Sequence, residues 1–111
     1  MRKKIYIAGK VTGLLSQDVE NKFFIASKNL YDMDLEPVNP VQVVNNPEAE
    51  WNEAMKLCVT ALMQCDAVLA LPCHSSSNGA KVEVWLAMNL AIPVFFDLNQ
   101  LRQWKNTPPT K

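Results

Sequence analysis

The sequence has no excess of charge of either sign and no long hydrophobic run. Its 111 residues contain 11 Lys and Arg and 11 Asp and Glu, so the formal net charge is zero. Nucleic-acid-binding domains usually carry a basic patch, so we expect no nucleic-acid partner. No apolar run approaches the roughly 20 residues of a membrane-spanning helix. The first residues, Met1 to Ile5, contain too short an apolar region for a signal peptide. We therefore expect a cytoplasmic protein without a membrane partner.

The chain is also poor in residues that bind metals or form disulfides. The three cysteines, Cys58, Cys65 and Cys73, lack the CxxC spacing, which favours reduced thiols over a disulfide framework. His74 adjoins Cys73, but a zinc site needs further ligands, and none is evident. We therefore expect no metal and no cofactor. His74 remains open as a ligand contact or an acid, because imidazole titrates near neutrality.

The hydrophobic pattern predicts a single domain over residues 1–105, followed by a tail over residues 106–111. Short apolar runs predict strands at 4–8, 35–38, 67–71 and 94–96, and helical spacing predicts helices at 18–33, 47–64, 79–90 and 98–105. Ser16 is a plausible N-cap, and residues 41–47 are expected to form a loop. This alternating order predicts an α/β fold, a doubly wound sheet of four to five mainly parallel strands with helices on both faces.

Three polar segments should meet where the parallel strands end. They are Gly9 to Gly13, Asn39, and Pro72 to Asn78. Ligands of such sheets bind beyond the carboxyl ends of the strands. The Gly9–Gly13 segment lacks the order and spacing of a phosphate-binding P-loop, but its glycines let the backbone approach a ligand.

Glu83 is the only acidic residue between Asp66 and Asp97, and it lies near the start of a predicted helix. Two interpretations remain open. Glu83 is either a nucleophile, kept ionised by the helix N-terminus, or an ordinary carboxylate that complements the helix dipole. Asp66 lies at the opposite end of its strand, so we expect it to be structural.

The helix predicted over residues 79–90 is apolar on more than one face and needs a second cover. Its large apolar residues are Val82, Val84, Trp85, Leu86, Met88 and Leu90. We therefore expect a homodimer or a higher homo-oligomer. Trp51 and Trp85 are expected in the core or an interface, and Trp104 across a dimer.

Several short motifs, in a fixed order from residue 4 to about residue 96, resemble the nucleoside 2-deoxyribosyltransferase-like superfamily. They are Ile5-Tyr6-Ile7-Ala8-Gly9 with Thr12-Gly13, Asn39-Pro40, Trp51, Cys65-Asp66-Ala67-Val68, Ser77-x-Gly79-Ala80-x-x-Glu83 and Ile92-Pro93-Val94. The sequence is most similar to a small bacterial and phage branch related to 2′-deoxynucleoside 5′-phosphate N-hydrolases. The resemblance implies a flavodoxin-like fold, a homo-oligomer, and hydrolysis or transfer at an N-glycosidic bond.

The resemblance also implies roles for single residues. Glu83 would attack C1′ of the sugar, and Ser77, six residues earlier, would face the 5′ end, where a serine tolerates a phosphate. This favours a nucleotide over a nucleoside. The expected substrate contacts are Tyr6, Gly9, Thr12, Asn39, Cys58, Ser75, Ser77, Asn78 and Gly79. For Tyr6, stacking on a base, contact with the sugar and a place in the core all remain open.

One position departs from the superfamily pattern. An aspartate eight residues before Asp66 would assist the nucleobase, but Cys58 stands there, on an apolar helical stripe. A buried thiol is a poor proton donor, so we interpret Cys58 as core or pocket lining. Three functions therefore remain open: an enzyme that forms a covalent sugar intermediate on Glu83, a non-catalytic (deoxy)nucleotide-binding protein of the same fold, and a purely structural oligomer.

Overall fold

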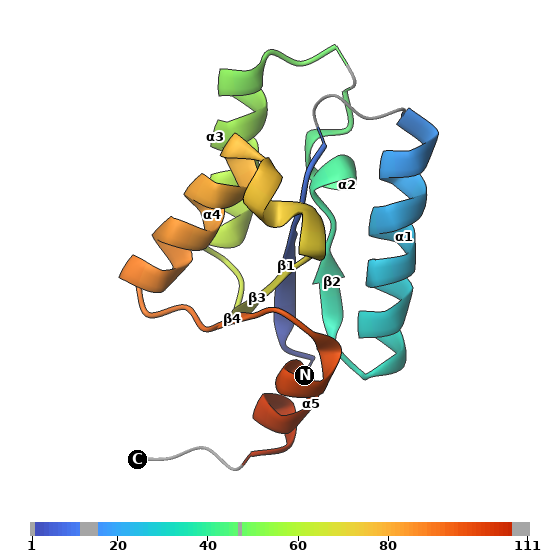
Figure 1. The fold of residues 1–111 in the computed structure, drawn as a ribbon, viewed down its shortest axis with the longest axis vertical. Coiled ribbons are helices and arrows are strands. Elements are labelled where there is room, and N and C mark those ends of the chain that lie inside the picture. Colours follow the sequence, from blue (N-terminus) through green and yellow to red (C-terminus); the bar gives the residue numbers. More distant parts are fainter. Residues whose placement is uncertain (1, 12–15, 47, 108–111) are drawn as a thin grey trace.

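The computed structural model describes residues 2–11, 16–46 and 48–107, and it forms a sheet with helices on both faces (Figure 1). The four strands are β1 (Lys4–Ala8), β2 (Glu36–Val38), β3 (Ala67–Ala70) and β4 (Val94–Phe95). They pair in parallel in the order β2-β1-β3-β4. This order is that of a flavodoxin-like sheet, which confirms the predicted fold class.

The strand order reverses between β1 and β3, and this point positions the candidate site. In the register of the sheet, Tyr6 on β1 pairs with Val38 on β2 and with Val68 on β3. The chain leaves β1 toward β2 on one side and reaches β3 on the other. The connections therefore separate above the carboxyl ends of β1 and β3, where such folds leave a crevice.

One face of the sheet is covered by α1 (Ser16–Asp32) and α5 (Leu98–Asn106). The side chains of Ile5 and Ile7 point to this face, and they pack with Phe23 and Leu30 of α1 and with Leu101 of α5. Period-2 alternation along β1 sends its other residues to the opposite face. The contiguous apolar run of β1 is thus buried on both sides.

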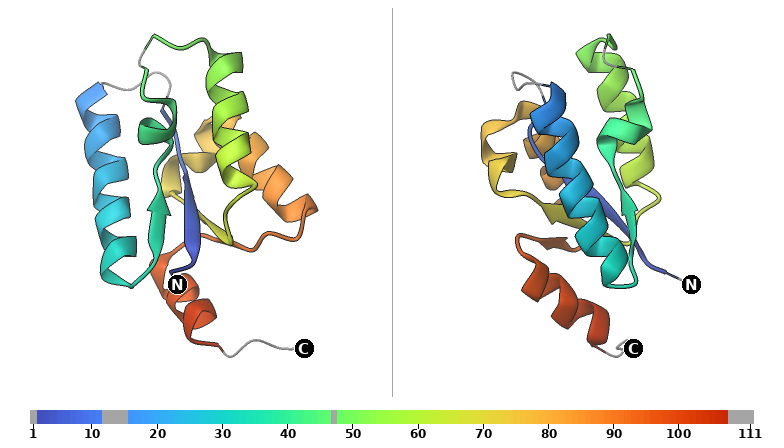
Figure 2. Two further views of the ribbon diagram at one scale, coloured as in Figure 1. Left: turned by 180° about the vertical axis from the view of Figure 1, so that it is seen from behind. Right: turned by 90° about the vertical axis from the view of Figure 1, so that its right-hand side faces the viewer.

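The opposite face is covered by α3 (Trp51–Leu62) and α4 (Asn78–Asn89), which lie together on one side of the sheet in Figures 1 and 2. Cys58 and Leu62 of α3 and Ala87 of α4 pack there against Tyr6 and Val68.

The described part of the chain contains no helix long and apolar enough to cross a membrane.

The sequence predicted a loop over residues 41–47, but a short helix, α2 (Pro40–Val44), covers most of this segment. The prediction is wrong for these helical residues. The Asn39 side chain accepts a hydrogen bond from the Val41 N–H at 3.0 Å, and Pro40 occupies the first helical turn with its φ already suited to a helix. The helix ends at Asn45, which has a left-handed φ of 49°. A helix of five residues is too short to show the helical spacing of apolar residues, so the sequence pattern did not predict it.

Other element boundaries shift by a few residues. The segment after β3 forms a 3₁₀ turn, Pro72–Ser76, in place of an open loop. Ser16 is the first residue of α1, and its expected capping side chain lies outside the described part of the structure. The helix α3 begins at Trp51, four residues after the predicted start. The helix α5 extends to Asn106, the first residue assigned to the tail.

Candidate functional site

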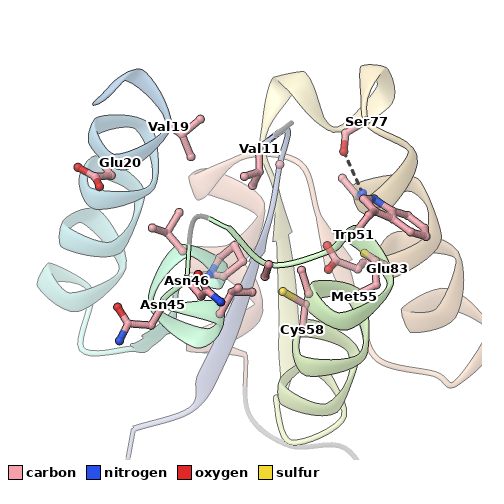
Figure 3. A pocket seen from close by; sticks show the side chains of 18 residues that line it. Val11, Val19, Glu20, Asn45, Asn46, Trp51, Met55, Cys58, Ser77 and Glu83 are labelled. Atoms are coloured by element: carbon pink, nitrogen blue, oxygen red, sulfur yellow. Dashed lines mark hydrogen bonds between the residues drawn. The ribbon is translucent and has the colours of Figure 1, made fainter. Parts of the chain in front are cut away.

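A cavity of about 590 Å³ lies at the carboxyl edge of the sheet, above the switch between β1 and β3 (Figure 3). Its walls come from the loop after β1, the start of α1, the segment from α2 to α3, and the start of α4. The volume lies in the range of small-molecule sites. The predicted segments Gly9–Gly13 and Pro72–Asn78 both reach this edge, through Gly9 and Ser77.

Glu83 lines this cavity and is held by a buried hydrogen bond. The phenol of Tyr6 donates to Glu83 Oε2 at 2.7 Å. Tyr6 has no exposed surface, and Glu83 is 5% exposed. Burial raises the pKa of Glu83 to about 7, although the hydrogen bond from Tyr6 lowers it in part. Burial, and then the Glu83 charge, raises the pKa of Tyr6, so the phenol stays protonated.

The expectation that the helix N-terminus keeps Glu83 ionised is therefore wrong. Glu83 lies in the second turn of α4, on the stripe that Ala80, Val84 and Ala87 bury against the sheet. The macrodipole acts mainly within the first turn, whereas desolvation acts wherever the group is buried. A carboxyl group with a pKa of about 7 is roughly half protonated at neutral pH.

Cys58 lies where the sequence predicted, in both the core and the cavity wall. Its side chain is 6% exposed. Burial is the main cause that raises the thiol pKa, and the nearby Glu83 charge raises it further, whereas a hydrogen bond with Tyr6 opposes them. Cys58 is thus a neutral thiol at neutral pH and cannot supply a ready proton to a leaving group.

The helix α4 begins close to α3 because its second residue has no side chain. A Cβ on Gly79 would lie 3.0 Å from Met55 Sδ and 3.7 Å from Trp51 Nε1. Ser77 caps the helix, and its Oγ accepts a hydrogen bond from the Ala80 N–H at 3.2 Å. This close approach brings the start of α4 to the cavity rim.

Gly9 has a packing role as well as a place in the cavity wall. A Cβ there would lie 3.0 Å from Leu71 Cδ1 and 3.1 Å from Phe23 Cζ. A larger residue at the end of β1 would therefore press on these two side chains, which would have to shift.

A second, smaller cavity of about 450 Å³ adjoins the first, and both are lined by Trp51, Ser77 and Gly79. The second cavity also contains Lys10 and Asn78. A cationic residue and the first residues of α4 line this space, a combination that favours an anionic group.

Four of the residues predicted to contact the substrate are not among the residues that line the two cavities. Asn39 is buried and caps α2, so it is structural and lines neither cavity. Ser75 also lines neither cavity. Tyr6 acts through Glu83 beneath the cavity wall and does not reach the cavity itself. Thr12 lies outside the described residues.

Other side chains singled out in the sequence are engaged away from the cavities. Asp66 Oδ2 accepts a hydrogen bond from the Lys4 N–H at 2.8 Å, which confirms its structural role. His74 Nδ1–H donates to the Leu71 carbonyl at 2.8 Å, and its ring lies 5.3 Å from that of Phe96. Trp104 packs on a neighbour in its own chain, Phe95, at 5.5 Å between ring centroids.

Cys73 has an environment unlike that of the other two cysteines. Its Sγ accepts hydrogen bonds from the Lys10 N–H at 3.2 Å and from Lys22 Nζ at 3.1 Å. Burial raises the thiol pKa, but these hydrogen bonds outweigh it and lower the pKa overall. The described ranges contain no group of three or more His, Cys, Asp or Glu side chains placed to hold a metal ion.

Several residues of the main cavity were not predicted from the sequence. Figure 3 shows Trp51 and Met55 on the side of the cavity that holds Glu83, and Asn45 and Asn46 on the α2 side. Glu20 of α1 also lines it. Trp51 and Met55 are one helical turn apart and precede Cys58, so their spacing was visible. Their position beside Gly79 could not be predicted from this spacing, because it depends on how α4 packs against α3.

Residues 3–96 match the model of a protein family described as a domain of unknown function, DUF4406. The chain belongs to this family. The match extends from β1 to β4 and includes every described residue that lines the two cavities, so the DUF4406 domain contains the whole candidate site. No curated protein matches the chain. Membership of DUF4406 therefore assigns no activity, and any function must be argued from the site.

Proposed function

We propose that the protein cleaves or transfers at the N-glycosidic bond of a nucleoside or nucleotide, with Glu83 as the nucleophile. One observation carries the proposal: Glu83 is a buried carboxyl group, held by the Tyr6 phenol at 2.7 Å, in the wall of a cavity at the β1/β3 switch point. The motif order that resembles the nucleoside 2-deoxyribosyltransferase-like superfamily supports the same assignment.

Ionised Glu83 performs the first step. Its carboxylate attacks C1′ of the sugar through an oxocarbenium-like transition state, a C1′–O bond forms, and the C1′–N bond breaks. The electron pair leaves with the nucleobase. Tyr6 donates to Oε2 and so holds the carboxylate in place. Water, or a second nucleobase, then attacks C1′ and frees Glu83.

Protonation of the departing base is the weak point of this reaction. Cys58 is buried and neutral where a carboxylic acid would assist. A general acid typically contributes about 10²- to 10⁴-fold. We therefore propose slow hydrolysis, with the base taking its proton from water.

The substrate class that this site favours is a 5′-nucleotide. The second cavity places Lys10 near Ser77 and the start of α4, beside the space that Glu83 lines. An ammonium group and helical N–H groups suit a phosphate, which a free nucleoside lacks.

The direct test is incubation with deoxynucleoside 5′-monophosphates, with free nucleobase measured by chromatography. Glu83→Gln keeps the shape of the side chain but removes the nucleophile, so base release should fall by about 10³-fold or more. Glu53→Gln is the matched control, because Glu53 is an exposed glutamate on α3 that lines neither cavity. Mass spectrometry of quenched wild-type protein should detect a sugar adduct that the Glu83→Gln variant lacks. Equal base release by both variants would rule out Glu83 as the nucleophile.

A second candidate function is nucleotide binding without turnover, and Cys58 is the observation that favours it. This binder would keep the cavity and lack an acid for the leaving group. If wild type releases no base while a deoxynucleotide raises its melting temperature, the binding function replaces the enzymatic one. No release and no shift would exclude both.

We further propose that copies of the chain associate through the outer face of α4. Trp85 is 63% exposed, Met88 55% and Val82 40%. These residues follow one another at helical spacing and form an apolar stripe that the described part of its own chain leaves uncovered.

A further inference from the structure

Trp51 is the aromatic side chain that the two cavities share. It is the first residue of α3, it is 50% exposed, and it lines both spaces. A tryptophan in a hydrophobic core loses most of its exposed surface. Trp51 instead keeps half of it at a concave site. Of the two places expected for Trp51, the core or an interface, this rules out the core.

The neighbours of Trp51 hold its ring at the cavity rim. Met55 lies one turn further along α3 on the same side of the cavity (Figure 3). Gly79 of α4 leaves room for both side chains, since even a Cβ at this position would touch Met55 Sδ at 3.0 Å. The indole is therefore set between the space lined by Glu83 and the space lined by Lys10.

A ligand that filled both cavities would have to pass this indole. An indole offers a flat, polarisable face, and the partner that gains most from such a face is another planar ring. Across the cavity, the segment after α2 contributes Asn45 and Asn46 to the lining. Amide side chains can donate to and accept from the edge of a heteroaromatic ring.

We propose that Trp51 is the nucleobase platform of this site and stacks on the base of the bound nucleotide. This inference rests on the proposed function for the identity of the ligand, but it gives a role to Trp51, which the motif order includes without a role and to which the family match assigns none. The contact uses the face of the base, which every nucleobase has. Trp51 should therefore accept both purines and pyrimidines, and selectivity must come from groups at the ring edge.

Intrinsic fluorescence can isolate this contact. The chain has three tryptophans, so Trp85→Phe with Trp104→Phe leaves Trp51 as the only indole. In this background, deoxyadenosine and thymidine 5′-monophosphates should each quench the emission in a saturable titration. The base-free analogue 2-deoxyribose 5-phosphate should not. Equal quenching by the sugar phosphate would overturn the inference.

Substitution of Trp51 then measures the contribution to binding. Trp51→Ala should weaken the calorimetric Kd for the two nucleotides roughly 5- to 100-fold, the usual effect of losing one base-stacking side chain. Trp51→Phe should recover part of the affinity. Tyr31→Ala is the matched control, because Tyr31 is 59% exposed on α1 and lines neither cavity. An unchanged Kd in a folded Trp51→Ala variant would contradict the inference.

The outcomes separate this inference from the proposed function. Base-dependent quenching without base release supports the platform and overturns catalysis. Base release with an unchanged KM in Trp51→Ala supports catalysis and overturns the platform. Absence of any quenching or binding by the three probes overturns both.

Discussion

At the scale of single residues, Glu83 as the proposed nucleophile would set the pH range of base release. Only the ionised carboxylate is a nucleophile, and its pKa is raised to about 7 by burial. We expect kcat/KM for base release to rise with pH and to level off above about pH 8. Tyr6→Phe removes the hydrogen bond that lowers this pKa, so the midpoint of the pH–rate profile should move upward. A midpoint that stays fixed or moves downward would contradict this role for Tyr6.

The same carboxyl group predicts a stability change that does not depend on any activity. The folded-state pKa of Glu83 lies above its unfolded value of 4.5, so its contribution to folding is complete below about pH 4.5 and is lost as pH rises through about 7. The shift corresponds to roughly 3 kcal/mol of unfolding free energy. Urea unfolding at pH 5 and pH 8.5 should show this loss in wild type and a smaller one in Glu83→Gln. An identical pH dependence in both proteins would mean that Glu83 is not desolvated.

A substitution of Cys58 tests whether an acid at this position would speed the proposed reaction. Cys58→Asp places a carboxyl group in the cavity wall beside Glu83, and base release should increase by about 10-fold or more, since a general acid is worth about 10²- to 10⁴-fold. The new charge should also raise the pKa of Glu83 and move the pH–rate midpoint upward. Cys58→Ser, which adds no acid, is the control. No increase in a folded Cys58→Asp variant would show that leaving-group protonation does not limit the rate.

At the scale of elements, the start of α4 combines a structural task with a proposed binding task in Ser77. Its Oγ caps the helix through the Ala80 N–H. Ser77→Ala should therefore cost about 1 kcal/mol of unfolding free energy, or about 4–8 °C in Tm. Ser76→Ala should cost less, because the exposed Ser76 hydroxyl donates to the Cys73 carbonyl and caps no helix.

Ser77→Asp separates the two tasks, because aspartate also caps helices. Its stability should stay close to that of wild type, while the negative charge repels a 5′-phosphate. We expect the preference to change from deoxynucleoside 5′-monophosphates to the corresponding nucleosides, measured as the ratio of the two Kd values. An unchanged ratio would place the 5′ end of the ligand elsewhere.

At the scale of the whole molecule, the outer face of α4 predicts self-association. Trp85→Glu places a charge in the middle of the apolar stripe, while the buried residues of α4 stay in the core. Light scattering coupled to size exclusion should detect a dimer or higher oligomer of wild type and a monomer of this variant. Lys56→Glu, a change of charge at an exposed position on α3, is the control. A wild-type monomer at high concentration would exclude the interface.

The sequence by itself determined the fold class, because four short apolar runs alternate with helical periods, an order typical of a parallel, doubly wound sheet. It also located the carboxyl edge of the sheet and placed Glu83 near the start of a helix behind that edge. The tertiary structure alone decided the state of Glu83. A position near a helix start predicts an ionised carboxylate, whereas burial against Tyr6, 77 residues away in the chain, raises its pKa. Trp51 followed the same rule: helical spacing placed it on an apolar stripe, but only the approach of α4 at Gly79 left it at the cavity rim. Desolvation and cavity shape depend on contacts between distant segments, and local sequence patterns do not encode them.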